Sequence, residues 1–151
     1  MFGKRSNVTQ VLSEAFILAV HNKMFNRVWS WAGQFRTSEK SLGINWPQIP
    51  IQLRLLIDDC KFWMEHEIYP TEEITVRFKH RLVAIHLFPN GNGRHSRLMA
   101  YIMMKQVFKK VVFSWGQNTY FDTNKARLAY IKALKTADQG NYEPLICFAQ
   151  S

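Results

Sequence analysis

The stretch from His86 to Arg97 contains a Gly-Asn-Gly turn between two helical patterns, and it constrains the fold more than any other part of this 151-residue chain. Apolar residues recur at helical spacing on both sides of the turn, ending before His86 and starting again at Arg94. Gly91 and Gly93 permit positive φ angles, so one helix can end there and another can begin. The sequence therefore predicts two helices joined by a tight loop, with His86 at the end of the first.

Periodic apolar residues elsewhere predict a mainly α fold, a helical bundle in one domain over residues 1–151. The polar stretch of about residues 35–45 lacks helical periodicity and suits a short hairpin or an exposed loop, and Val111–Phe113 suits a short extended piece. The predicted helices run from a Ser13 cap towards Trp29, from Pro47 and Pro50 to about Met64, from Thr71 to Ile85, from Arg94 to Lys105, from about Thr123 to Asp138, and beyond Pro144.

Positive charge exceeds negative charge: 20 Lys and Arg against 11 Asp and Glu give a formal net charge of +9. The basic residues are spread along the chain rather than gathered in one block, which favours a phosphate ligand or an acidic partner over nucleic acid. No helix-turn-helix or RNA-binding signature accompanies the charge, which argues further against a nucleic-acid partner. Hydrophobic residues make up 47% of the chain, so long disordered spans are not expected.

The two cysteines, Cys60 and Cys147, form no CxxC pattern and both lie in apolar helical stretches. Buried free thiols are therefore expected, which places the protein in a reducing compartment and predicts a cytoplasmic location. The chain opens without the basic and apolar pattern of a signal peptide, and no apolar run reaches transmembrane length, so no membrane association is expected.

The loop chemistry points to an anion. Successive N–H groups in a glycine turn can converge on an anion, and the next helix adds its free N–H groups and partial positive charge. Arg94 and Arg97 lie three residues apart, so they share a helix face near that end and can clamp phosphate oxygens. His86 can accept a hydroxyl proton near neutral pH. Asn90 offers a carbonyl oxygen to a Mg²⁺ ion held mainly by phosphates.

Each of these features also has a purely structural explanation. Gly-Asn-Gly alone is a common turn, a single histidine before a turn is more often a core or surface residue, and the two arginines could pair with nearby carboxylates. The ordered combination within twelve residues is much more specific than any one of its parts.

The segment resembles the signature of Fic-domain proteins, H-x-F-x-(D/E)-G-N-G-R-x-x-R. The matching residues are His86, Phe88, Gly91, Asn92, Gly93, Arg94 and Arg97. Segments 25–36, 130–134 and 140–145 also look like parts of the family, so the resemblance covers most of the chain, and it is strongest to the bacterial branch often labelled mobile mystery protein B.

The resemblance implies a Fic-fold bundle with a small β-hairpin flap and transfer of AMP from ATP, with Mg²⁺, onto a Ser, Thr or Tyr hydroxyl of a target protein. In that scheme His86 is the general base, the Gly91-Asn92-Gly93 backbone and the Asn92 side chain form an anion hole, Arg94 holds the phosphates and Arg97 reaches the terminal phosphate. The flap that aligns the target chain would consist of Lys40, Ser41, Leu42, Gly43 and Ile44.

The sequence departs from the family pattern at two positions. Leu87 replaces a frequent proline, which is a minor change. Asn90 replaces the acidic metal ligand, and a neutral amide holds Mg²⁺ less tightly, so the loop could bind nucleotide with little turnover. A distant branch that phosphorylates its targets lacks the second glycine found here, so the resemblance favours nucleotidylation.

The family's inhibitory motif, (S/T)-x-x-x-E-(G/N), is absent from this sequence. Either the chain is a shortened form, or a separate, antitoxin-like protein with an acidic helix supplies the inhibition. The competing hypotheses are a nucleotide-binding or interaction module without transfer activity, and a metal hydrolase. The second has little support, because His80, His86 and His95 form no HExxH or zinc-type spacing.

Overall fold

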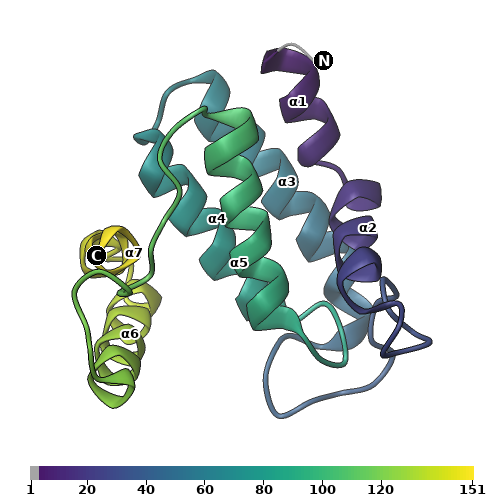
Figure 1. Cartoon of the computed structure of the whole chain (residues 1–151). Helices are drawn as coiled ribbons and strands as arrows, with labels where there is room; N and C mark the ends of the chain where they lie inside the picture. The colour runs from purple at the N-terminus through teal and green to yellow at the C-terminus, as the bar shows by residue number, and fades with distance from the viewer. Residues whose placement is uncertain (1–3) are drawn as a thin grey trace.

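The computed structural model describes residues 4–151, and every regular element in this part of the chain is a helix (Figure 1). The fold is therefore mainly α, as expected. The α-helices are α1 (Lys4–Val11), α2 (Glu14–Phe25), α3 (Ile49–Glu65), α4 (Thr71–Ile85), α5 (Asn92–Ile102), α6 (Thr123–Asp138) and α7 (Glu143–Gln150); a 3-10 turn, η1 (Trp46–Gln48), precedes α3, and a π-helical turn, η2 (Met103–Val107), extends α5. None of these helices combines the length and apolar character that a membrane span requires.

Helices α1 to α5 pack around the main hydrophobic core, with α5 in contact with both α2 and α4. Ser13 caps α2 as expected, because its hydroxyl accepts the Phe16 N–H at 3.2 Å. Each helix contributes one apolar face, represented by Ile17, Leu53, Phe78 and Met99, all of them at most 1% exposed. This core holds the end of α4 and the start of α5 together. The signature loop, residues 86–97, joins the two helices and includes the first turns of α5.

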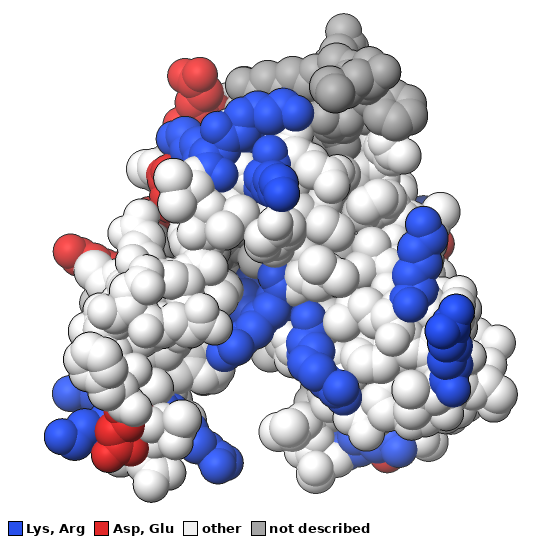
Figure 2. All heavy atoms as spheres, in the orientation of Figure 1, with Lys and Arg blue, Asp and Glu red and all other residues white. Residues whose placement is uncertain are grey.

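Helices α6 and α7 form a pair that packs on the outer side of α4, apart from α1 to α3 (Figure 1). Their smaller apolar cluster is centred on Val76 of α4 and includes Ala133, Ala137, Leu145 and Ala149. The space-filling view shows a hollow between this pair and the main body, with Lys and Arg side chains on its walls (Figure 2). The helix pair therefore forms a second wall beside the signature loop.

The expected β-hairpin at residues 35–45 does not form, because these residues make an irregular loop without strands. The buried Arg36 guanidinium donates hydrogen bonds to the backbone carbonyls of Ser38 and Ile44, within the loop, and of Ile85 and His86, outside it. One side chain thus binds carbonyl groups across the loop. Val111–Phe113 likewise forms no strand.

Two further expectations are wrong in detail. The helix predicted from Ser13 towards Trp29 ends at Phe25, and turns follow it. Cys60 is buried, but Cys147 is exposed because α7 turns Leu145, Phe148 and Ala149 inward.

Candidate functional site

His86 is the residue immediately after α4, and its backbone lies in the left-handed region with φ 59°. The Arg36 guanidinium donates to its carbonyl, and Gly43 packs so closely that a Cβ added there would lie 2.6 Å from the His86 Cβ. Burial, followed by the positive charges of Arg36 and Lys40, lowers the pKa of His86. The half-buried imidazole is therefore neutral at neutral pH and able to accept a proton.

The loop after His86 is fixed by side chains that hydrogen-bond to its own backbone. The Asn92 amide accepts the Phe88 N–H at 3.0 Å and donates to the Phe88 carbonyl at 2.8 Å. The side-chain oxygen Oδ1 of Asn90 accepts the Gly91 N–H at 2.8 Å. Both side chains thus have a structural task, and the Gly91 N–H, expected to face an anion, is already paired.

His21 positions this loop from α2, a role that the sequence patterns did not reveal. Its Nε2 donates to the Asn90 carbonyl at 3.0 Å and its Nδ1 accepts the Gly33 N–H at 2.9 Å. Its ring stacks on the fully buried Phe88 with centroids 3.6 Å apart. Burial lowers the pKa of His21, consistent with a neutral ring. The only signal in the sequence was a histidine on the apolar face of a predicted helix.

Helix α5 begins at Asn92 without a side-chain cap. The first N–H groups of a helix have no intrahelical partner, so the amides of Asn92, Gly93 and Arg94 are available to an anion. Gly91, with φ 81°, makes the turn as expected. Gly93 lies inside the helix, so its expected positive φ is not observed. A Cβ added at Gly93 would meet nothing within 4 Å, so there is open space beside these amides.

Arg94 and Arg97 are exposed, and neither forms an ion pair with any carboxylate in residues 4–151. The Arg94 guanidinium lies 4.8 Å from the centroid of the Phe25 ring. That of Arg97 lies 5.7 Å and 5.6 Å from the Trp115 and Tyr130 rings. Aromatic rings thus orient both arginines and leave their hydrogen-bond donors free.

A cavity of about 680 Å³ brings most of these residues together, and this volume is in the range of small-molecule sites. One wall is the signature loop with His86, Pro89, Asn90, Gly91, Asn92, Gly93 and Arg94. Leu42 and Gly43 of the expected flap also line it, whereas Lys40, Ser41, Ile44 and Arg97 do not. The remaining wall, which the sequence did not predict, consists of His80, Val83 and Ala84 of α4 and Tyr130, Leu134 and Asp138 of α6.

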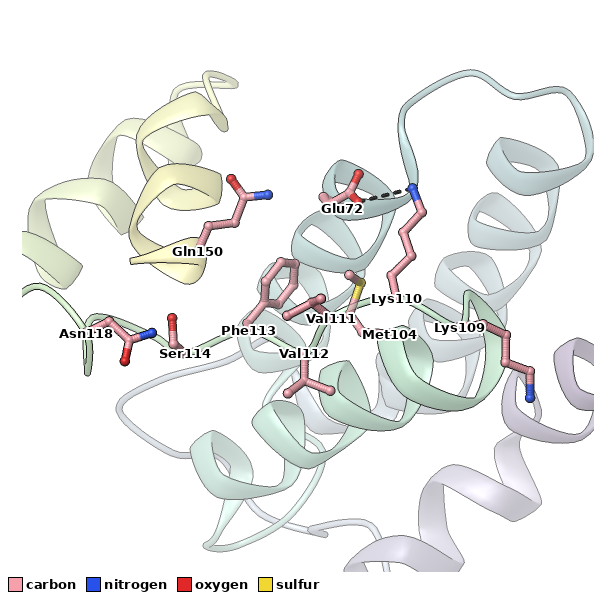
Figure 3. Close-up of a pocket in the computed structure, with 10 residues that line it drawn as sticks. All are labelled: Glu72, Met104, Lys109, Lys110, Val111, Val112, Phe113, Ser114, Asn118 and Gln150. Atoms are coloured by element: carbon pink, nitrogen blue, oxygen red, sulfur yellow. Dashed lines mark hydrogen bonds and ion pairs between the residues drawn. The ribbon is translucent and has the colours of Figure 1, made fainter.

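Two other features of the molecule bear on the expected chemistry. The part of the chain that the structure describes contains no cluster of three His, Cys, Asp or Glu residues that could hold a metal ion. A second cavity of about 520 Å³ lies at the start of α4, between residues 109–114 and the end of α7, where Lys110 pairs with Glu72 (Figure 3). None of the candidate site residues lines it.

Comparison with known proteins identifies a family and several named relatives. The sequence profile described as the Fic/DOC family matches residues 11–104. Relatives named "Protein adenylyltransferase Fic" include one from Drosophila grimshawi, 29% identical over 138 residues, and one from Aedes aegypti, 26% identical over 137 residues. Each match covers 87% of this chain but only 26% of the relative, so the chain spans about a quarter of the length of these relatives.

Solved structures share the fold. Fic-1 (residues 134–508) from C. elegans superposes with a TM-score of 0.70 at 21% identity, covering 91% of this chain and 39% of that one. The BepC protein of Bartonella tribocorum, a VirB-translocated effector with bound AMPPNP, superposes with a TM-score of 0.67 at 19% identity, covering 93% of this chain and 74% of that one. Because the family profile matches more than half of the sequence and the helical architecture is the same, the chain belongs to the Fic/DOC family.

Proposed function

We propose that this chain is a protein adenylyltransferase, which transfers AMP from ATP to a hydroxyl side chain of a target protein. The central observation is that the uncapped start of α5 and the neutral imidazole of His86 line one cavity. The names of the curated relatives support the same activity. A helix N-terminus suits a phosphate, and a neutral imidazole suits removal of a hydroxyl proton.

In the proposed reaction His86 accepts the proton of the target hydroxyl. The hydroxyl oxygen forms a bond to the α-phosphorus of ATP, the bond from that phosphorus to the β-phosphate oxygen breaks, and pyrophosphate leaves. The amides of Asn92, Gly93 and Arg94 stabilise the charge on the phosphate oxygens, and the Arg94 and Arg97 guanidinium groups hold the phosphates. The Gly91 N–H contributes only if Asn90 releases it.

The loop of residues 40–44 is proposed to place the target chain beside His86. Leu42 and Gly43 line the cavity, and Leu42 is 68% exposed, which leaves an apolar side chain free to contact a target. Because the loop has no strand, an incoming peptide would have to pair with backbone groups that become extended on binding.

Mg²⁺ is proposed to enter with the nucleotide, where it would neutralise part of the phosphate charge. The described residues fit a metal held by the protein poorly, because they form no carboxylate cluster and the Asn90 oxygen already accepts the Gly91 N–H. This observation favours a second candidate function, a nucleotide-binding or interaction module with weak or no transfer. Calorimetry separates the two, because the second predicts ATP binding without any labelled product.

The remaining assignments are proposals from the sequence. The resemblance of residues 86–97 supports the bacterial branch labelled mobile mystery protein B, and the free thiols support a cytoplasmic location. A separate inhibitory protein with an acidic helix would complement the unpaired arginines of α5.

His86→Ala tests the transfer reaction directly. With labelled ATP and a cell lysate as the source of targets, the variant should label proteins at least about a hundredfold more slowly, because no other group is proposed to take the hydroxyl proton. ATP affinity, measured by calorimetry, should change little. His66→Ala is the matched control, since His66 is an exposed histidine at the end of α3. Equal labelling by wild type and His86→Ala would remove His86 from the mechanism.

A further inference from the structure

Lys79 is a buried amine that the proposed reaction does not use. Its side chain lies on α4 and is only 2% exposed. Its Nζ lies 2.8 Å from the Tyr130 hydroxyl and 5.0 Å from the centroid of the Trp115 ring. No carboxylate among residues 4–151 forms an ion pair with it. A buried amine without a counter-charge is unfavourable unless it is neutral or receives an anion.

A second basic group faces the same two rings. The Arg97 guanidinium, from α5, lies 5.7 Å from the Trp115 ring and 5.6 Å from the Tyr130 ring, close to the corresponding distances of 5.0 Å and 5.4 Å for the Lys79 amine. Two basic groups thus share one aromatic surface. Burial, and then the positive charge of Arg97, lowers the pKa of Lys79 to about 7. The groups facing the amine are Tyr130 from α6, Arg97 from α5 and Trp115 from the linker between η2 and α6, residues 108–122.

The linker holds Trp115 in this position at some conformational cost. Its φ is 50°, in the left-handed region that bulky residues rarely occupy. The N–H groups of Ser114 and Trp115 both donate to the Ala149 carbonyl of α7 at 2.9 Å, which fixes the turn. Such strained positions are often found at ligand sites.

The cluster of Lys79, Arg97, Trp115 and Tyr130 adjoins the candidate site through Tyr130. Tyr130 lines the 680 Å³ cavity together with Arg94, and Arg97 lies about one turn further along α5. Lys and Arg side chains are visible on the walls of the hollow between the main body and the pair of α6 and α7 (Figure 2). An extended anion at the start of α5 would therefore run towards this cluster.

We propose that Lys79 joins Arg97, which the proposed reaction already assigns to the phosphates, in binding the terminal, pyrophosphate end of the nucleotide, and that Lys79 takes up a proton as this anion binds. The inference rests on the proposed function for the identity of the ligand. The anion supplies the counter-charge that the free protein lacks, so protonation of the amine becomes favourable when the phosphates arrive.

Calorimetry with inorganic pyrophosphate at pH 8 tests the proposal on the full chain. Titrations in two buffers of different ionisation enthalpy give the number of protons exchanged. Wild type should take up more protons than Lys79→Met, and the variant should bind pyrophosphate about tenfold more weakly or worse. The comparison between the two proteins is the readout, because pyrophosphate itself also titrates. Equal affinity and equal proton exchange in the two proteins would overturn the proposal.

Two controls define the result. Lys132→Met removes an exposed lysine from α6, two residues from Tyr130 and so on a different face, and should leave both quantities unchanged. His66→Ala, which removes an exposed histidine at the end of α3, should likewise leave both quantities unchanged. If Lys79→Met does not fold, the wild-type pH profile decides: pyrophosphate affinity that fails to weaken between pH 7 and pH 9 contradicts the proposal.

The outcome is also distinct from that of the proposed function. Pyrophosphate binding that depends on Lys79, in a protein that never labels a target, would support the anion site and refute the transferase. Labelling that depends on His86, together with pyrophosphate binding that does not depend on Lys79, would support the transferase and refute the anion site at Lys79.

Discussion

Asn90 stabilises the turn before α5, and its side chain also stands at the position where the family pattern has an acidic metal ligand. Its side-chain oxygen accepts the Gly91 N–H, and its backbone carbonyl accepts from His21. Both contacts hold the turn before α5, and the side chain is exposed at the cavity. A carboxylate could make the same hydrogen bond and add a negative charge where a nucleotide-bound metal would lie.

The substitution Asn90→Asp should therefore change ATP binding in opposite directions with and without Mg²⁺. Without the metal the new charge repels the phosphates and weakens binding; with it, a carboxylate ligand strengthens binding. Calorimetry in EDTA and in excess Mg²⁺ measures both. Asn141→Asp is the matched control, because Asn141 makes the same type of contact, to the Glu143 N–H at the start of α7. Identical behaviour of wild type and Asn90→Asp in both conditions would exclude this position as a metal ligand.

At the scale of the element, the start of α5 combines a turn with an open anion site, and its two glycines divide these tasks. Gly91 has φ 81°, and a Cβ added there would lie 2.6 Å from the Phe25 ring. Gly93 is helical, and a Cβ added there has nothing within 4 Å. The first glycine is required by the fold, whereas the second leaves space that a phosphate can occupy.

Alanine at each position should separate stability from binding. Gly91→Ala should lower the free energy of unfolding by roughly 1–3 kcal/mol, because it combines backbone strain with a clash. Gly93→Ala should leave stability unchanged or raise it by up to about 1 kcal/mol through helix propensity, yet weaken ATP binding because the methyl group narrows the cavity. Urea denaturation and calorimetry give the two quantities. If Gly93→Ala bound ATP as tightly as wild type does, ATP binding would not require the phosphates to approach the backbone of residue 93 closely.

At the scale of the whole molecule, neutral histidines join the helices around the signature loop. His95 is 1% exposed, its Nε2 donates to the Ile17 carbonyl of α2 at 2.9 Å, and burial lowers its pKa to about 4. Burial also lowers the pKa of His21, which links the same helix to the loop. The fold therefore depends on imidazole rings that are neutral, each with a single N–H group.

This dependence predicts a loss of stability in acid. The unfolded chain protonates its histidines near pH 6.5, whereas folded His95 stays neutral until about pH 4. The stabilisation is fully present above pH 6.5 and is lost as the pH falls towards 4, amounting to roughly 3 kcal/mol for His95 alone. Urea denaturation at pH 7.5, 5.5 and 4.5 measures it, and His95→Gln should flatten the decrease. Constant stability over this range would show that His95 is not buried in neutral form.

The sequence by itself determined the helices from α2 to α7, though not α1, and the order of the signature residues, because apolar periodicity and glycine breaks are local properties of the chain. Thr71–Ile85 and Thr123–Asp138 have the predicted bounds, and His86 ends the first of these helices. Only the tertiary structure decided which polar groups of the loop hydrogen-bond within the loop and which residues of other helices face it across the cavity. Three contacts join residues that lie far apart in sequence. Arg36 binds the His86 carbonyl, His21 binds the Asn90 carbonyl, and Tyr130 of α6 lies beside Lys79 of α4. Such contacts depend on how the helices pack, and the spacing of residues along one helix does not encode them.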